Sequence, residues 1–328
     1  MNLQKITKIE HLKEGMENVI ILVYVSQAYT FSSKRGERFS RLILNDKSGS
    51  INAFLKSPLP PRSGSIIRVR GNVGNYNGNK TFYMTEIMNT YKVEDLPPEA
   101  KEHLFPSLTQ EEISKVKKDL IDLINRTEDT EIQNLLRAIF FGEGIPEHLS
   151  EILKRIWHYP AASKIHHARI GGLLQHSVKA GKLVEKIALE YKDFVIRDIA
   201  VAGALIHDIG KILEQKEIPG TGWTEEGELL GHIAMGYELL IEIARYIDIA
   251  PDKLTALKHI ILSHHGEKEK GSPVVPLTPE ALIVHAIEDL ESHIDSIIGS
   301  APEEPGRGET PNAFSKRIFY YHLGRDRR

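Results

Sequence analysis

The 328-residue sequence contains no cysteine, which excludes disulfide bonds, thiolate metal sites and cysteine nucleophiles. It has no apolar run that approaches the roughly 18 residues of a membrane span. Its first residues, MNLQKITKIEHLKEG, lack the apolar core of a secretory signal. These absences favour a cytoplasmic protein without a membrane partner. Apolar residues make up 41% of the chain, which allows a sizeable core and excludes wholesale disorder.

Charge and histidine are both distributed unevenly along the chain. Residues 1–95 contain 8 Lys, 6 Arg and 8 acidic residues, a balance of +6, although the whole chain carries −3. A basic module joined to an acidic remainder predicts an anionic partner for the basic part. Of the 15 histidines, 11 lie between His158 and His293. Without cysteine, this stretch is the expected place for metal or acid–base chemistry.

The N-terminal region has the pattern of a small β-barrel. β-Branched and aromatic runs separated by turn residues predict strands at 19–31, 38–46, 50–56, 66–73 and 80–87. Five strands in about 75 residues fit a Greek-key barrel of the OB type, which binds single strands by stacking bases on aromatic side chains. Lys34, Arg35 and Arg38 form a basic loop after the first strand. We expect this loop to bind nucleic acid; a solvated hairpin tip is the alternative.

The rest of the chain is predicted to be helical. Three prolines mark residues 91–106 as a linker, and helices are expected at 110–125, 130–141, 146–157, 171–191, 196–213, 226–247, 251–264 and 278–298. The predicted fold class is therefore multi-domain, an all-β OB barrel followed by an all-α bundle. We divide the chain into the barrel (1–95), a linker with connecting helices (96–145), the helical domain (146–300) and a C-terminal loop with a basic tail (301–328).

One predicted helix carries two polar residues in an otherwise apolar sequence. The segment IAVAGALIHDIGKIL, residues 199–213, is apolar nearly all round, so its helix should be central and buried. His207 and Asp208 interrupt it. Burying an unpartnered carboxylate costs several kcal/mol, and a cation is the simplest compensation. A structural His–Asp hydrogen bond is the alternative.

Other polar residues interrupt apolar patterns on separate predicted helices: His176, His232, His264 with His265, and Glu288 with Asp289. A helical bundle projects such residues into one shared interior, as in carboxylate-bridged dimetal proteins. Their nitrogen and oxygen donors suit Mn²⁺, Fe²⁺, Co²⁺, Mg²⁺ or Zn²⁺. Lys211 follows His207 by one helical turn and is placed to neutralise charge on phosphoryl oxygens.

The runs HHARIGGLLQHS, HDIGK, EGELLGHI, ILSHHG and AIEDLE resemble the motifs of HD-domain phosphohydrolases. With a barrel in front of them, they resemble the YhaM family of 3′–5′ exoribonucleases. The resemblance implies that His176, His207, Asp208 and Glu288 hold one metal, and that Asp208 bridges to a second metal held by His232, His264 and His265. The family has Asp where Glu288 stands, so Asp289 is the alternative ligand.

The resemblance also implies an activity. Two divalent ions, Mn²⁺ foremost, would support hydrolysis of single-stranded RNA from its 3′ end to nucleoside 5′-monophosphates, with Asp208 and Lys211 as the catalytic residues. His166 and His167 precede a Gly-Gly turn and are expected to contact substrate phosphate. Single-stranded DNA as a substrate and a homo-oligomeric state stay open. The alternatives are a phosphodiesterase or phosphatase of small nucleotides, or a non-catalytic single-strand-binding protein.

Overall fold

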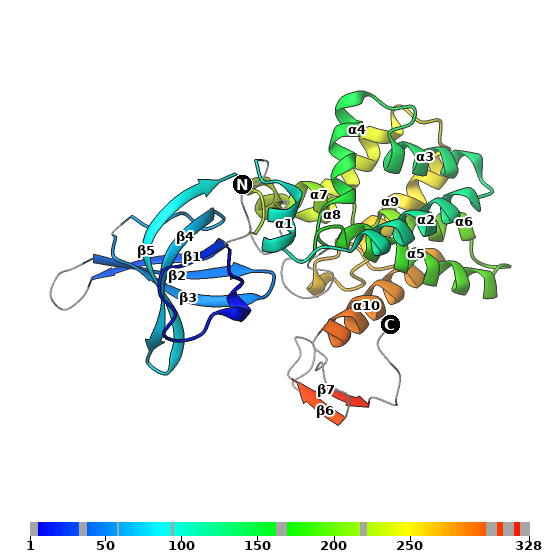
Figure 1. The fold of residues 1–328 in the computed structure, drawn as a ribbon. Coiled ribbons are helices and arrows are strands. Elements are labelled where there is room, and N and C mark those ends of the chain that lie inside the picture. Colours follow the sequence, from blue (N-terminus) through cyan, green and yellow to red (C-terminus); the bar gives the residue numbers. More distant parts are fainter. Residues whose placement is uncertain are drawn as a thin grey trace. The chain divides into compact units, whose positions relative to one another are not determined.

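A computed structural model of the chain describes residues 6–32, 38–57, 59–92, 95–161, 169–216 and 222–299, together with strands at 307–310 and 318–321. The chain forms two compact units, Met1–Ser107 and Leu108–Arg328 (Figure 1). The first unit is a β-barrel with two short helices, and the second is mainly helical. The predicted order, a small all-β barrel followed by an all-α bundle, is confirmed.

Five strands close the barrel: β1 (Val19–Ser32), β2 (Arg38–Asp46), β3 (Gly49–Leu55), β4 (Ile66–Tyr76) and β5 (Asn79–Tyr91). Their spatial order is β1-β2-β3-β5-β4, with β4 returning to β1. The pair β3–β5 is parallel and the other pairs are antiparallel. This is the Greek-key closure of the OB type, as the strand count and the turns predicted.

Alternation along the strands fills the barrel with apolar side chains. Ile21, Val23 and Val25 of β1 are fully buried, as is Phe82 of β5. Because successive strand residues point to opposite faces, about half of the aromatic side chains of the strands lie on the outer surface of the barrel. Two short helices, η1 (Ile9–His11) and α1 (Pro98–Leu104), belong to the same unit.

The helical unit follows the predicted order of elements. Its helices are α2 (Gln110–Asn125), α3 (Thr130–Phe141), α4 (Glu147–Leu153), η2 (Lys154–Trp157), α5 (Gly172–Glu190), α6 (Arg197–Ile206), α7 (Lys211–Glu214), α8 (Glu225–Ala244), α9 (Pro251–Ser263), η3 (Lys268–Lys270) and α10 (Pro279–Gly299). The helices α2 and α3, expected only as connecting helices, contribute side chains to the same apolar core as α5, α6 and α9. None of the helices in the described residues is long and apolar enough to cross a membrane.

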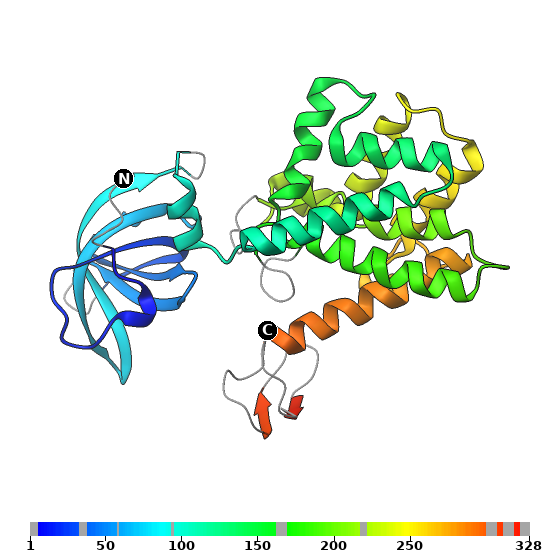
Figure 2. The same cartoon turned by 45° about the vertical axis from the view of Figure 1, so that its right-hand side comes forward.

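Helix α6 lies at the centre of this unit. It packs against α3, α5, α9 and α10, and Figures 1 and 2 both show α5 running beside α2 and α6. Eight of its residues, Ile199 to Ile206, are buried. The predicted continuous helix 196–213 is wrong in one respect: α6 ends at Ile206, and residues 207–210 form a turn before α7.

The C-terminal region also differs from the prediction of a loop and tail. Strands β6 (Arg307–Thr310) and β7 (Ile318–Tyr321) pair antiparallel. The second strand carries the sequence IFYY, whose β-branched and aromatic residues favour an extended backbone.

Helix α8 passes close to the turn after α6. A Cβ atom built on Gly210 would lie 2.0 Å from the carbonyl oxygen of His232 and 2.5 Å from the backbone nitrogen of Gly236. Only glycine allows this approach, since backbone atoms cannot move aside as a flexible side chain can. The contact fixes the turn that carries His207 and Asp208 relative to the helix that carries His232.

We expect Gly210→Ala to destabilise the protein by about 1–3 kcal/mol, the usual cost of overpacking. The control is Gly181→Ala on α5, whose added Cβ would meet the side chains of Leu205 and Leu123 at 3.2 and 3.3 Å. Those side chains can shift, and Ala gains about 1 kcal/mol of helix propensity over Gly. Urea denaturation measures both free energies of unfolding. Equal stability of the two variants would contradict the close approach at Gly210.

Candidate metal centre in the helical unit

Five histidines and one aspartate from four parts of the helical unit meet in its interior. His176 comes from α5, His207 and Asp208 from the turn after α6, His232 from α8, and His264 with His265 from the end of α9. They form two groups, each with its ligand atoms within 4.8 Å of one another: His176, His207 and Asp208, and His232, His264 and His265.

Two glycines with positive φ angles lie next to the histidines of the second group. Gly231 has a φ of 73° and kinks α8 immediately before His232. Gly266 has a φ of 79° and lies directly after the histidine pair that ends α9. Consecutive residues on a continuous helix point about 100° apart. Since α9 ends at Ser263, His264 and His265 both turn toward the same interior, as the sequence pattern predicted.

In the first group, two imidazoles face each other through their Nε2 atoms. His176 Nδ1 lies 2.6 Å from Glu291 Oε2, and His207 Nδ1 lies 2.9 Å from the carbonyl oxygen of Ala204. These oxygens only accept hydrogen bonds, so each Nδ1 carries a proton and donates it. The two Nε2 atoms, 3.2 Å apart, then present lone pairs to each other. Such a pair is repulsive unless a proton or a metal cation lies between them.

The second group repeats the pattern with different acceptors. His232 Nδ1 donates to Glu214 Oε1 at 3.0 Å, His264 Nδ1 to the carbonyl of Ile261 at 2.8 Å, and His265 Nδ1 to the carbonyl of Lys270 at 3.0 Å. A histidine that ligates a metal almost always donates its other ring N–H to a carboxylate or carbonyl. In all five histidines Nδ1 is therefore the nitrogen that donates outward, and Nε2 is the nitrogen on the side of the cluster.

Three buried ligand atoms lack a hydrogen-bond partner among the described residues. They are Asp208 Oδ1, His232 Nε2 and His264 Nε2. The two imidazole nitrogens each lie 3.5 Å from Asp208 Oδ1. An orphaned buried polar atom costs about 1–3 kcal/mol, so three converging on one point need a common partner. A divalent cation of the kind that N and O donors bind fits these atoms.

Asp208 lies between the two histidine groups. Its Oδ2 lies 2.6 Å from Lys211 Nζ and 3.3 Å from His207 Nε2. Its Oδ1 faces His232 and His264. A carboxylate with one oxygen toward each group has the geometry of a bridge. The predicted catalytic residue Lys211 contacts this carboxylate and is itself 8% exposed.

Burial and neighbouring charges set the protonation of these groups. Burial lowers the pKa of His176 and of His265 to about 4 and that of His264 well below its usual value, so these imidazoles are neutral, as metal ligands must be. Burial alone would raise the pKa of Asp208, but Lys211 and His207 outweigh it and hold it well below its usual value. The buried carboxylate is therefore ionised.

The two candidate carboxylates in the middle of α10, Glu288 and Asp289, have separate environments. Burial raises the pKa of Glu288 to about 7, and this group interacts electrostatically with His207 and Asp208. Asp289 instead lies 3.8 Å from Lys270 Nζ and 3.2 Å from His293 Nδ1. The structure thus places Glu288 toward the centre and Asp289 away from it, although the ligand role of either stays a prediction.

Sequence reasoning missed Glu291 and Glu214, the two carboxylates that orient His176 and His232. Glu291 could have been found, because it follows Glu288 by three residues and so lies on the same helix face. Glu214 had no such signal, since its contact with His232 depends on how α7 and α8 pack. Of the other predicted site residues, Lys34, Arg35, His166 and His167 lie outside the described residues, and Arg38 is the exposed first residue of β2.

Comparison with known proteins agrees with this geometry. The HD domain family matches residues 173–292, which include the whole cluster. A protein of Oceanobacillus iheyensis named 3′–5′ exoribonuclease YhaM is 33% identical over 303 residues, 88% of this chain and 86% of that protein. This chain belongs to the YhaM family.

Other members with the same name extend the match. The protein of Geobacillus sp. is 29% identical over 95% of this chain and 91% of its own length, and that of Listeria monocytogenes is 28% identical over 92% of each. Membership in the YhaM family together with the HD domain makes this chain an enzyme of the phosphohydrolase class. A solved structure, the second OB-fold domain of replication protein A from Methanococcus maripaludis, aligns with 28% of this chain and 97% of that domain at 25% identity and a TM-score of 0.22.

We expect Mn²⁺ to stabilise the protein against heat and His264→Ala to abolish this effect, because a ligand that binds only the folded state raises the melting temperature. The matched control is His259→Ala on the same helix, whose Nε2 accepts from the backbone nitrogen of Leu277 at 2.9 Å. Differential scanning calorimetry with Mn²⁺ or EDTA measures the shift. A Mn²⁺ shift that survives in His264→Ala, or is lost in His259→Ala, would contradict the metal centre.

Proposed function

We propose that this chain is a metal-dependent 3′–5′ exoribonuclease that hydrolyses single-stranded RNA to nucleoside 5′-monophosphates. The observation that supports the proposal best is the convergence of four imidazole Nε2 atoms, those of His176, His207, His232 and His264, on the carboxylate of Asp208. His265 belongs to the same group as His232 and His264. RNA as the substrate and the 3′–5′ direction are supported by the names of the relatives in the family, 3′–5′ exoribonuclease YhaM.

The donors divide into two sets that share Asp208. We propose that His176, His207, Asp208 and Glu288 hold one divalent cation, and that Asp208, His232, His264 and His265 hold the other. Mn²⁺ is our first expectation, and the same donors also suit Fe²⁺, Co²⁺, Mg²⁺ or Zn²⁺. When bound, two such cations supply the positive charge that activates a water and stabilises the phosphoryl group under attack.

The protein's own residues prepare this chemistry. Glu291 and Glu214 fix the orientation and tautomer of His176 and His232, so little reorganisation is needed when the cations bind. Lys211 balances the charge of Asp208 and adds a cation beside the reacting group. Burial raises the pKa of Glu288 to about 7, and a carboxyl group must release its proton to bind a cation.

The barrel supplies a surface for nucleic-acid bases. Five aromatic rings lie in contact on the outside of β1 to β5: Phe31, Phe39, Phe54, Tyr76 and Tyr83. With Lys56 and Met84 they line a hollow of about 300 Å³. Phe31 is 41% and Tyr76 51% exposed, so both rings are accessible to a nucleic-acid base. Stacking of successive bases on such rings is how single strands are held without sequence preference.

Basic residues complete the proposed strand-binding surface. Arg38 begins β2, one residue before Phe39 of the aromatic cluster. We assign Arg38 to contacts with the RNA backbone, together with Lys34 and Arg35, and His166 and His167 to contacts with the phosphate that is cleaved. Single-stranded DNA offers the same base faces and phosphates, so we expect it to bind this surface as well.

We expect Asp208→Asn to reduce RNA hydrolysis by at least about 10³-fold, the scale of losing a key electrostatic element of the transition state. The barrel should still bind RNA with the wild-type dissociation constant. Asp198→Asn is the matched control, because Asp198 is also buried on α6 but accepts only from backbone nitrogens 128 and 129 and from Arg197. Rates from labelled RNA on a sequencing gel, normalised to folded protein, decide the matter. Near-normal hydrolysis by Asp208→Asn would refute the mechanism.

The double variant Phe31→Ala with Tyr76→Ala should weaken RNA binding by at least about 30-fold, since each of the two stacked bases contributes about 1–3 kcal/mol. Turnover of p-nitrophenyl thymidine phosphate should stay unchanged, because one nucleotide does not need the strand-binding surface. Tyr246→Ala removes a 44%-exposed ring of the helical unit and serves as control. Unchanged RNA affinity in the double variant would favour the alternative of a small-nucleotide phosphodiesterase.

A further inference from the structure

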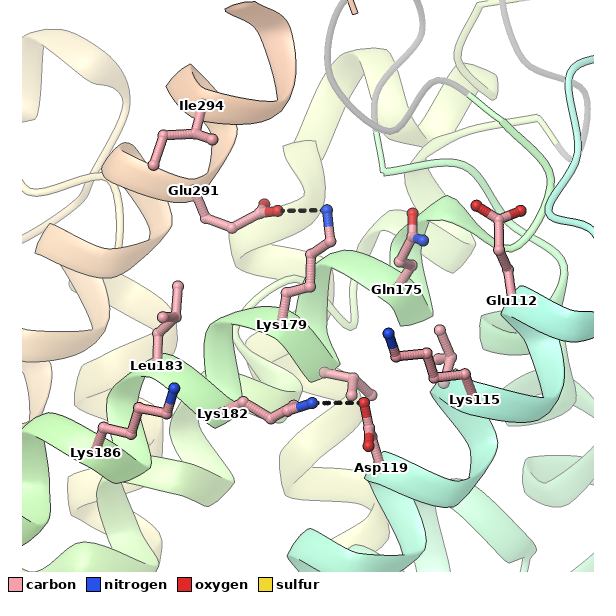
Figure 3. A pocket seen from close by; sticks show the side chains of 12 residues that line it. Glu112, Lys115, Asp119, Gln175, Lys179, Lys182, Leu183, Lys186, Glu291 and Ile294 are labelled. Carbon is pink, nitrogen blue, oxygen red and sulfur yellow. Dashed lines mark hydrogen bonds and ion pairs between the residues drawn. The ribbon is translucent and has the colours of Figure 1, made fainter. Parts of the chain in front are cut away.

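A pocket of the helical unit lies beside the metal centre. Of the residues described above as orienting the metal centre, it includes Glu291. It occupies about 450 Å³ between α2, α5 and α10. Figure 3 shows four lysines around it: Lys115 from α2, and Lys179, Lys182 and Lys186 from successive turns of α5. Small-molecule sites in proteins have volumes of about 300–1,000 Å³, so the pocket is large enough for one nucleotide.

The charges around the pocket are not balanced. Lys182 Nζ lies 2.7 Å from Asp119, and Lys179 Nζ lies 3.2 Å from Glu291. Lys115 and Lys186 have no carboxylate within ion-pair distance among the described residues. Glu112, the remaining acidic group of the lining, accepts from the backbone nitrogen of Thr109 in a capping box. Two ammonium groups of the pocket are therefore available to an anion.

The walls between the lysines are apolar. Val116 and Val178 are buried, and Leu183 and Ile294 complete the lining. Ile294 is 45% exposed, so a flat apolar group that entered the pocket would cover it. An apolar wall next to ammonium groups matches a ligand with an aromatic base at one end and a phosphate at the other.

We propose that this pocket binds a free nucleotide, with the phosphate held by Lys115 and Lys186 and the base against the apolar wall. The binding step rests on Lys115, Lys186 and the apolar wall, none of which is assigned to the metal centre, so it is tested separately from the proposed exoribonuclease activity. The connection to the metal centre through Glu291 rests on the proposed function.

One side chain connects the pocket to the metal centre. Glu291 Oε1 faces Lys179 at 3.2 Å, and Glu291 Oε2 accepts from His176 Nδ1 at 2.6 Å. A phosphate in the pocket competes with Glu291 for Lys179 and so weakens the ion pair between Lys179 and Glu291. The carboxylate then becomes a stronger acceptor, which makes His176 a better ligand. The bound nucleotide should therefore tighten cation binding, and by linkage the cation should tighten nucleotide binding.

Isothermal titration calorimetry of the full chain in EDTA tests the binding step, since the chelator removes any route through metal ions. Wild-type protein should bind 5′-AMP, and the variant Lys115→Ala/Lys186→Ala should bind it at least about tenfold more weakly, as expected for loss of charge-assisted hydrogen bonds. The control Lys118→Ala/Lys192→Ala removes two exposed lysines that do not line the pocket and should change the affinity less than twofold. Absence of AMP binding, or equal weakening in both variants, would overturn the proposal.

Three further experiments test the identity of the ligand, its coupling to Mn²⁺ binding through Glu291, and the role of the pocket in RNA hydrolysis. Adenosine should bind at least tenfold more weakly than AMP, and so should inorganic phosphate; equal binding of either would refute recognition of a nucleotide. AMP should lower the dissociation constant of Mn²⁺ for wild-type protein but not for Lys115→Ala/Lys186→Ala, and an effect that persists in the variant would refute the connection through Glu291. RNA hydrolysis without AMP should stay within twofold in that variant. A larger loss would show that the pocket holds phosphates of the RNA strand instead.

Discussion

Burial of the ionised Asp208 carboxylate constrains the whole helical unit. An isolated carboxylate in an apolar interior costs several kcal/mol even after relaxation, and Asp208 is 1% exposed in the turn that follows the buried helix α6. Lys211 balances part of this charge from the next turn, and the imidazoles of four helices surround the rest. The apolar packing of α6 thus determines where charge must be compensated, and this location determines where a cation can bind.

The hydrogen-bond acceptors around the five histidines determine which nitrogen of each imidazole faces the candidate metal centre. Each of the five imidazoles would bind a cation equally well through either nitrogen in isolation. Carboxylates and carbonyls occupy every Nδ1, so the Nε2 atoms are the ones that converge. Two of these acceptors, Glu214 and Glu291, are carboxylates that add negative charge near the cations. Glu291 also contacts Lys179, so the environment of the metal centre extends to the lysine-lined pocket of α5.

The two units divide the physical requirements of the proposed reaction. Phosphodiester cleavage needs buried, preorganised charge, and the helical core supplies it because its ligands come from rigid helices. Holding a flexible strand needs an exposed surface of neighbouring aromatic rings. The barrel provides that surface because strand alternation places about half of its aromatic side chains outside. Phe82 lies in the barrel core while Phe31 and Tyr76 stay exposed.

The sequence by itself determined the element types, the barrel closure and the identity of the histidines and Asp208 that meet, because apolar periodicity is a local property and each polar interruption is visible within it. It did not determine which acid of α10 faces the centre, since Glu288, Asp289 and Glu291 differ only by helix phase and by what packs opposite them. It also missed the break of α6 at residue 207, which lies where α8 packs closely against Gly210 with residues more than 20 positions away in the chain. The roles of Glu214 and Lys179 were likewise decided by tertiary packing, since each contacts a partner that no local pattern brings near.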